Sequence, residues 1–219
     1  MRHLLRLCLL SLAALATGSA ATIYDNTTTD ASISYFYSAY PVTEIGDRVT
    51  FGGTERYLTG ASVEFFNRGT GAGTFSAIMQ LYQNGSPVGA AIGSPVQVNG
   101  LAIARSGFLV VDFAFPELLV PDTVVFGVSV SNVVGALDLG LNAYRGPSGS
   151  GGAPAIGTSN LAEVFTGTPL SRRPTSATTG NLYFRATANA ASTNPIPEPA
   201  TLLTLGAGLL TLIALRRRR

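Results

Sequence analysis

The chain has 219 residues, with fourteen basic residues, all arginine, against twelve acidic residues, and it contains one histidine, one cysteine and no tryptophan. The histidine and the cysteine stand within the first ten residues, whereas residues 22–199 hold eight arginines and all twelve acidic residues, a net charge of −4. This central part therefore cannot build a Ser-His-Asp triad, a Cys-His dyad, a histidine zinc site or a disulfide. Its mildly acidic charge also excludes a basic surface for nucleic acid.

Residues 1–21 have the three-part pattern of a secretory signal peptide. Two arginines and a histidine come before an apolar run at residues 7–16, and small residues end the segment at Ala20 and Ala21. We expect export through the Sec translocon and cleavage by signal peptidase after Ala20 or Ala21. Cys8 lies at the start of the apolar run and does not follow it, so the lipoprotein pattern is absent.

Short alternating runs between turn residues fill residues 22–187, and long helical periodicity is absent there. The clearest runs are residues 75–81, 109–115 and 124–131, and Asn84-Gly85-Ser86-Pro87 supplies turn chemistry after the first of them. Further strands are expected near residues 22–25, 48–51, 57–66, 96–103, 137–144 and 182–187, with a long Gly/Ser/Pro-rich loop at 146–159. About nine short strands with polar connections predict an all-β fold, a single antiparallel β-sandwich of jelly-roll type.

The segment Tyr35-Phe-Tyr37-Ser-Ala-Tyr40 is the part of this body most suggestive of binding. Tyrosine rings stack on sugar rings and their hydroxyls bond to the sugar rim, so Tyr35, Tyr37 and Tyr40 are candidates for glycan binding. The alternative is a strand whose alternate residues Tyr35 and Tyr37 pack on the sheet, because aromatic residues suit strands. The absence of tryptophan weakens the carbohydrate interpretation.

Paired carboxylates could cleave glycosidic bonds without histidine or cysteine. The nearest candidates in the sequence are Asp112, Glu117, Asp122 and Asp138. Asp112 falls on the outward face of its predicted strand and Asp122 lies in a Pro-Asp turn, so ordinary structural roles explain both. No second motif supports a catalytic site, and we expect no enzymatic activity and assign no catalytic residue.

Asp25, Asn26 and Asp30 stand close enough in the sequence to supply oxygen ligands for calcium. No EF-hand or repeat spacing accompanies them, and capping or turn formation explains the same residues. We therefore predict neither a metal site nor a cofactor.

Residues 195–219 contain three consecutive signals. Pro195-Ile-Pro-Glu-Pro199 is followed by a run without any charge, Ala200 to Leu215, and then by Arg216, Arg217, Arg218 and Arg219. The uncharged run would span about 24 Å as a helix, a little short of the roughly 30 Å hydrocarbon core, and we expect one transmembrane helix. The four arginines should stop transfer and stay on the cytoplasmic side, which leaves the body outside.

This arrangement resembles the PEP-CTERM sorting signal of bacterial surface proteins. The resemblance implies that exosortase, a membrane-embedded enzyme, recognises the chain and processes it near Pro197, Glu198 and Pro199. The two prolines hold Glu198 in an extended backbone, which suits a peptide bound by a protease-like site. A plain C-terminal anchor behind a proline-rich linker is the alternative.

The sequence thus divides into a signal peptide at 1–21, a β-sandwich ectodomain at 22–187, a linker at 188–196 and a sorting signal at 197–219. Segments of the body resemble the small β-rich ectodomains of choice-of-anchor type that precede such signals, namely Tyr24-Asp-Asn, Gly46-Asp-Arg-Val-Thr50, Gly53-Thr-Glu-Arg-Tyr-Leu-Thr59 and Val120-Pro-Asp-Thr123. The resemblance implies a structural or adhesive protein of an exopolysaccharide or biofilm matrix. Such a protein is anchored in the inner membrane before processing and lies at the cell surface afterwards. A carbohydrate-binding module and a carboxylate-based glycosidase are the alternatives.

Overall fold

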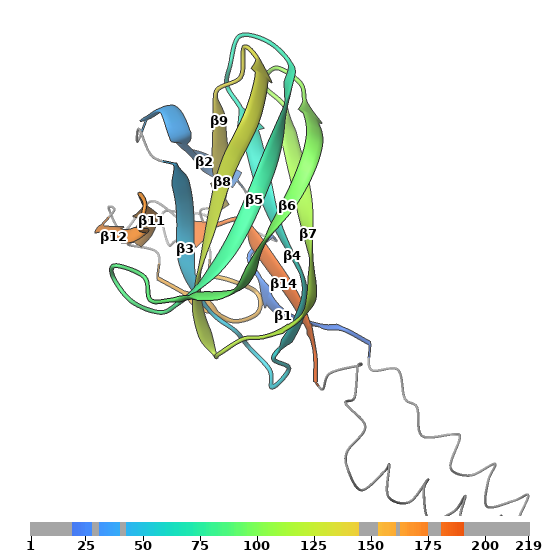
Figure 1. The fold of residues 1–219 in the computed structure, drawn as a ribbon, viewed down its shortest axis with the longest axis vertical. Coiled ribbons are helices and arrows are strands. Elements are labelled where there is room, and N and C mark those ends of the chain that lie inside the picture. The colour runs from blue at the N-terminus through green and yellow to red at the C-terminus, as the bar shows by residue number, and fades with distance from the viewer. Residues whose placement is uncertain are drawn as a thin grey trace, which may run out of the picture.

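The computed structural model describes residues 19–27, 31–39, 43–144, 153–160, 163–174 and 181–190, which form two antiparallel β-sheets (Figure 1). Sheet A comprises β1 (Ala21–Asp25), β2 (Ala31–Phe36), β4 (Tyr57–Asn67), β7 (Phe108–Leu119), β9 (Leu139–Tyr144), β13 (Asn181–Leu182) and β14 (Phe184–Asn189). Sheet B comprises β3 (Glu44–Thr50), β5 (Gly73–Gln83), β6 (Ala91–Ile103), β8 (Thr123–Gly135), β10 (Thr158–Ser159), β11 (Glu163–Thr166) and β12 (Ser171–Pro174).

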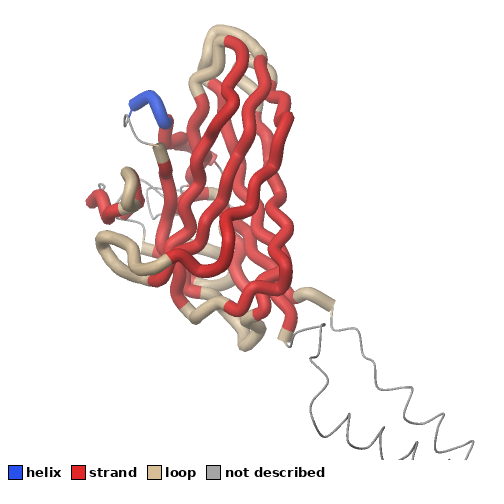
Figure 2. The backbone as a smooth tube through the Cα atoms, viewed as in Figure 1, coloured by secondary structure: helices blue, strands red, loops and turns tan. Residues whose placement is uncertain are grey.

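Strands dominate the described residues, which include one short 3₁₀ helix, η1 (Tyr37–Ala39) (Figure 2). No helix in these described ranges is long and apolar enough to cross a membrane. The predicted transmembrane helix and the predicted sorting signal lie outside the described residues, as does all of the predicted signal peptide before Ser19.

The path of the chain between the sheets is that of a jelly roll. From β3 to β9 the chain crosses between the sheets at every connection except the β5–β6 hairpin. The resulting strand orders are β1-β14-β4-β7 in sheet A and β3-β8-β5-β6 in sheet B. The predicted all-β, antiparallel architecture is confirmed.

Strand β7 confirms the alternation expected from the sequence, since Phe113 is buried and Asp112 is exposed. Strand β8 departs from it, because Val125, on the side away from the main core, is buried as well. Phe165 of β11 and Leu170 of the following turn cover Val125 in a second, small apolar cluster. The sequence pattern of β8 alone could not show this cover, which comes from a segment about forty residues later in the chain.

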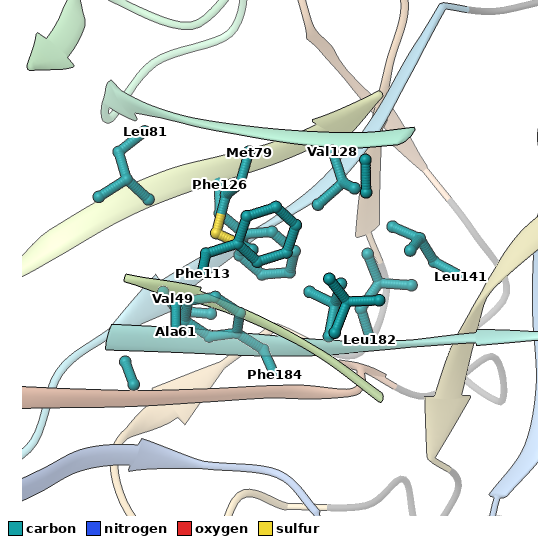
Figure 3. Packing of buried hydrophobic residues seen from close by; sticks show 14 of the residues in the cluster. Val49, Ala61, Met79, Leu81, Phe113, Phe126, Val128, Leu141, Leu182 and Phe184 are labelled. Carbon is teal, nitrogen blue, oxygen red and sulfur yellow. The ribbon is translucent and has the colours of Figure 1, made fainter. Parts of the chain in front are cut away.

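Large apolar side chains from both sheets meet in one core (Figure 3). Phe126 of β8 stacks on Phe184 of β14 with ring centroids 4.1 Å apart, and Phe65 of β4 meets Phe75 of β5 edge to face at 5.0 Å. Each pair joins sheet A to sheet B, and full burial of one such side chain stabilises a fold by about 1.5–3 kcal/mol. The core therefore holds the two sheets in a fixed face-to-face arrangement.

Strands β4 and β9 pair only over residues 65–67 and 139–141 and then diverge. The β13–β14 segment lies between β4 and β9 where they diverge, because Leu182 pairs with Ala143 of β9 and Phe184 pairs with Val63 of β4. The last strands of the body are thus inserted between strands formed much earlier in the chain.

The two ends of the described body lie side by side. Ala21 at the start of β1 pairs with Ala188 of β14, and Asn189 pairs with Tyr57 at the start of β4. We call this end of the sandwich the base. The opposite end is the tip, formed by the connections at residues 68–72, 104–107 and 136–138 (Figure 1).

Several boundaries differ from those expected. Strand β14 continues to Asn189, two residues into the predicted linker, because it pairs with both β1 and β4. Strand β3 begins at Glu44, several residues earlier than expected, and the β11–β12 hairpin had no predicted counterpart. Strand β2 corresponds to the strand that the packing alternative expected at Tyr35, and it ends at Phe36. The end of the predicted loop at 146–159 forms β10, which pairs with β3.

Candidate functional site

The outer face of sheet A, meaning the side turned away from the core, carries three phenylalanines near the tip. Strand register places Phe36, Phe66 and Phe108 in one row, with Gly140 of β9 between the first two. The ring centroids of Phe36 and Phe66 are 6.1 Å apart, and those of Phe66 and Phe108 are 4.7 Å apart. A Cβ on Gly140 would lie 2.9 Å from the Phe36 ring, so glycine is needed for that ring to lie across β9. Phe108 is 57% exposed, and we call these three residues the aromatic row.

Arg68 ends the aromatic row at the tip. Its guanidinium carbon lies 3.8 Å from the centroid of the Phe36 ring, a cation–π contact. Its Nε donates to Asp138 at 2.5 Å, and the Ser38 hydroxyl donates to the same carboxylate at 2.5 Å. Burial acts to raise the pKa of Asp138, but the hydrogen bonds from Ser38 and Arg68 outweigh it and hold that pKa below its ordinary value. The ionised carboxylate therefore balances the charge of Arg68.

A polar row follows the aromatic row in the direction of the base. The Ser34 hydroxyl donates to Asn142 Oδ1 at 3.2 Å, and Asn142 Nδ2 donates to Glu64 Oε2 at 2.5 Å. Tyr183 lies close to these groups. Burial, followed by the carboxylate of Glu64, raises the pKa of Tyr183, so its phenol remains a neutral hydroxyl at ordinary pH.

A shallow depression of about 270 Å³ lies in the same face nearer the base, and we call it the polar groove. Its polar lining comes from Ser62, Asp112, Arg185 and Thr187, which register brings together from β4, β7 and β14. The Ser62 hydroxyl donates to Asp112 Oδ1 at 2.6 Å. A Cβ on Gly60 would lie 3.1 Å from Thr187 Oγ1, so Gly60 keeps the floor of the groove open.

The tyrosine cluster of the sequence does not form an exposed binding surface. Tyr35 is 3% exposed and Tyr37 is 9% exposed, and both belong to the core. The Tyr37 hydroxyl donates to the carbonyl oxygen of Val128 at 2.8 Å, and burial raises the pKa of Tyr37 well above its usual range. The structure thus places both rings where the packing alternative expected them, although the strand ends at Phe36. Tyr40 lies outside the described residues.

Each of the four candidate carboxylates has a different hydrogen-bonding partner. Asp112 accepts from Ser62 in the polar groove, and Asp138 is paired with Arg68 at the tip. Glu117 accepts from Asn189 Nδ2 at 3.0 Å, and Asp122 accepts from Arg56 Nε at 2.8 Å. The polar groove is lined by only one of these carboxylates, Asp112, so its described lining lacks the second carboxylate that glycoside cleavage requires.

The oxygen-rich segment after β1 serves the backbone. Asp25 Oδ1 accepts from the N–H of Thr27 at 2.9 Å, an Asx-type turn. Asn26 is buried, and its Nδ2 donates to the carbonyl oxygens of Asn181 and Leu182 at 3.2 and 3.0 Å. Asp30 lies outside the described residues, and the described part of the chain holds no group of three or more potential metal ligands.

A second polar cluster surrounds β3, and the sequence analysis did not single it out. Glu163 of β11, whose side chain is 1% exposed, forms ion pairs with Arg48 at 3.2 Å and with Arg172. Asp47 is equally buried and accepts from the backbone N–H groups of Arg48 at 2.7 Å and Leu182 at 3.3 Å. Burial raises the pKa of Asp47 well above its usual range. These contacts connect β3 to β11 and β13. No spacing of residues in the sequence predicts them.

Comparison with known proteins identifies one segment of the chain. Residues 195–219 match the family model of the PEP-CTERM protein-sorting motif, which confirms the resemblance drawn from Pro197, Glu198 and Pro199 and the arginines that follow. The chain therefore carries a sorting signal that implies export, membrane anchoring before processing, and exosortase as the processing partner. Neither the curated proteins nor the solved structures include a match to this chain.

Proposed function

We propose that this protein is exported through the Sec route, held by its C-terminal helix, processed by exosortase and left at the cell surface. There it serves as a non-enzymatic structural or adhesive component of an exopolysaccharide or biofilm matrix. The observation that carries the proposal is the sorting motif at residues 195–219, since such a signal serves delivery to the cell surface.

The geometry of the body supports this placement. The chain enters the sandwich at Ala21 and leaves it at Asn189, and both residues lie at the base. The predicted linker and the sorting signal therefore continue the chain from the base of the sandwich.

A non-enzymatic role is supported by the surroundings of the carboxylates. Catalysis by carboxylates needs two of them at one substrate site, whereas Glu117, Asp122 and Asp138 each bond to a partner outside the polar groove. The groove is also shallow and open on a sheet face, and such a face suits binding of a polymer better than exclusion of water from a reacting bond.

The test is the C-terminus of the protein recovered from its producing cell. Intact-mass measurement of the cell-surface and medium fractions should give a chain that ends near Pro197–Pro199. The variant Glu198→Ala should instead keep Arg219 and stay in the membrane fraction, because the enzyme loses the only charged group of its motif.

The matched control is Asn194→Ala, which changes the predicted linker and leaves the motif whole. It should be processed like the natural chain. An intact Arg219 in the natural chain as well as in Glu198→Ala would contradict exosortase processing and would indicate an ordinary membrane anchor.

A further inference from the structure

Two surface features, the aromatic row and the polar groove, share the outer face of sheet A, and the sorting signal accounts for neither. The aromatic row and the polar groove both include β4, at Phe66 and Gly60 respectively. Six residues of strand at about 3.3 Å each place them about 20 Å apart, along one strand direction. The two features therefore lie along one strand of the same face, with the rings toward the tip and the polar groups toward the base.

The chemistry of the face matches a carbohydrate. A sugar ring has an apolar C–H face and a rim of hydroxyls, and aromatic rings offer the flat apolar partner for the first. Phe108 presents such a surface at 57% exposure, and Phe66 supports it from the side. The rim needs donors and acceptors close together, which Asp112 and Arg185 supply in the groove.

The charges on the face favour a neutral chain over an anionic one. Arg68 is neutralised by Asp138. Arg185 lies in the same cross-strand row as Asp112, with Ser62 between them, and Glu64 lies two residues farther along β4. The described residues of this face thus carry no excess of positive charge with which to attract a polyanion. An acidic polysaccharide, a nucleic acid or an anionic lipid surface would gain nothing from it electrostatically.

We propose that the outer face of sheet A binds a neutral polysaccharide chain, with sugar rings against the aromatic row and hydroxyls in the polar groove. The inference deepens the proposed matrix role and rests on it for the class of polymer that the protein meets. Carbohydrate binding is thereby assigned to Phe66, Phe108 and Asp112 instead of the buried Tyr35 and Tyr37.

The experiment uses the full chain from its producing cell and measures retardation in affinity gels and binding heat with dextran, mannan and a neutral β-glucan. Alginate serves as the anionic comparison. At least one neutral polymer should bind more tightly than alginate. Phe108→Ala and Asp112→Asn should each weaken that binding about tenfold or more, because each removes a central contact. Both side chains are exposed, so both variants should unfold at the same urea concentration as the natural chain.

Two matched controls lie off this face. Val134→Ala removes an exposed apolar side chain from β8, at 64% exposure, and Asp122→Asn removes a carboxylate at 79% exposure near the base. Neither should change binding. The inference is overturned if no neutral polymer binds, if alginate binds more tightly, or if the controls weaken binding as much as the face variants do. It is also overturned if Phe108→Ala abolishes self-association of the chain and leaves polysaccharide binding intact. C-terminal mass on the same samples reports exosortase processing separately, so the two proposals fail independently.

Discussion

Glu44 shows how one side chain can make the fold sensitive to pH. It is buried at the start of β3, and its carboxylate occupies the space where a Cβ on Gly127 would lie. The Tyr82 hydroxyl donates to its two oxygens at 3.0 and 3.1 Å. Burial raises the pKa of Glu44 to about 7, and the hydrogen bond from Tyr82 only partly opposes that rise.

Stability should therefore fall as the pH rises from about 4.5 to about 7. The folded chain holds the Glu44 proton more tightly than the unfolded chain does. Protonation of Glu44 therefore contributes its full stabilisation below about pH 4.5, and this contribution is lost as the pH rises through the pKa of Glu44 in the folded chain. The loss is at most about 3 kcal/mol, by the usual conversion of a pKa difference into free energy. Glu44→Gln cannot titrate and should lack this part of the pH dependence in urea unfolding at about pH 5 and about pH 8.

The matched control is Glu55→Gln, a change of the same kind near the base. Its unfolding free energy should depend on pH as that of the natural chain does. The same pH dependence in Glu44→Gln as in the natural chain would show that Glu44 does not carry the effect.

At the scale of elements, the β3–β8 pair depends on a close approach of two backbones. Gly46 of β3 pairs directly with Gly127 of β8. A Cβ on Gly46 would overlap the carbonyl oxygen of Phe126, which is backbone and cannot rotate away. The strand that carries Asp47 and Arg48 is therefore held against β8 by the absence of a side chain at one position.

Gly46→Ala should destabilise the protein by about 3 kcal/mol or more, because the two strands must separate to admit the methyl group. Gly71→Ala is the matched control at the tip, where the added Cβ would meet only the Ala136 side chain at an ordinary 3.5 Å. It should change the free energy of unfolding by about 0.5 kcal/mol or less. Chemical unfolding of both variants tests this, and equal losses would contradict the steric explanation.

At the scale of the whole molecule, the last strand completes the sandwich. β14 pairs with β1 on one side and β4 on the other, and it contributes Phe184, Ala186 and Ala188, all fully buried, to the core. Strand β1, near the start of the exported chain, therefore can pair only after β14, near the end of the body, has also been exported.

A chain ended after Ala190 should consequently fold and appear in the medium, since it keeps β14 and lacks the C-terminal signal. A chain ended after Tyr183 should be degraded, because β1 and the core lose β14. Limited proteolysis and the amount recovered in the medium distinguish the two. Equal protease resistance of both chains would show that β14 is not needed to close the sandwich.

Local periodicity predicted much of the sheet and little of the candidate face. The alternation at residues 109–115 predicted β7 correctly because one of its faces packs on the core and the other meets solvent. The aromatic row escaped prediction because Phe36, Phe66 and Phe108 come from three strands, and only the register makes them neighbours. The tyrosines drew attention because they are close in sequence, yet Tyr35 of β2 and Tyr37 of η1 are both buried in the core.

The sequence by itself determined that the chain carries a sorting signal, and the tertiary structure decided which of its residues share a surface. A sorting signal acts through properties that are contiguous in the chain, such as the Pro-Glu-Pro motif, the length of an uncharged run and the arginines after it. A binding face on a sheet is assembled from residues that lie one per strand and far apart in the chain. Gly140 admits the Phe36 ring and Gly60 keeps the polar groove open. The two glycines matter because of the side chains that lie beside them, and those neighbours are determined only when the strands pair.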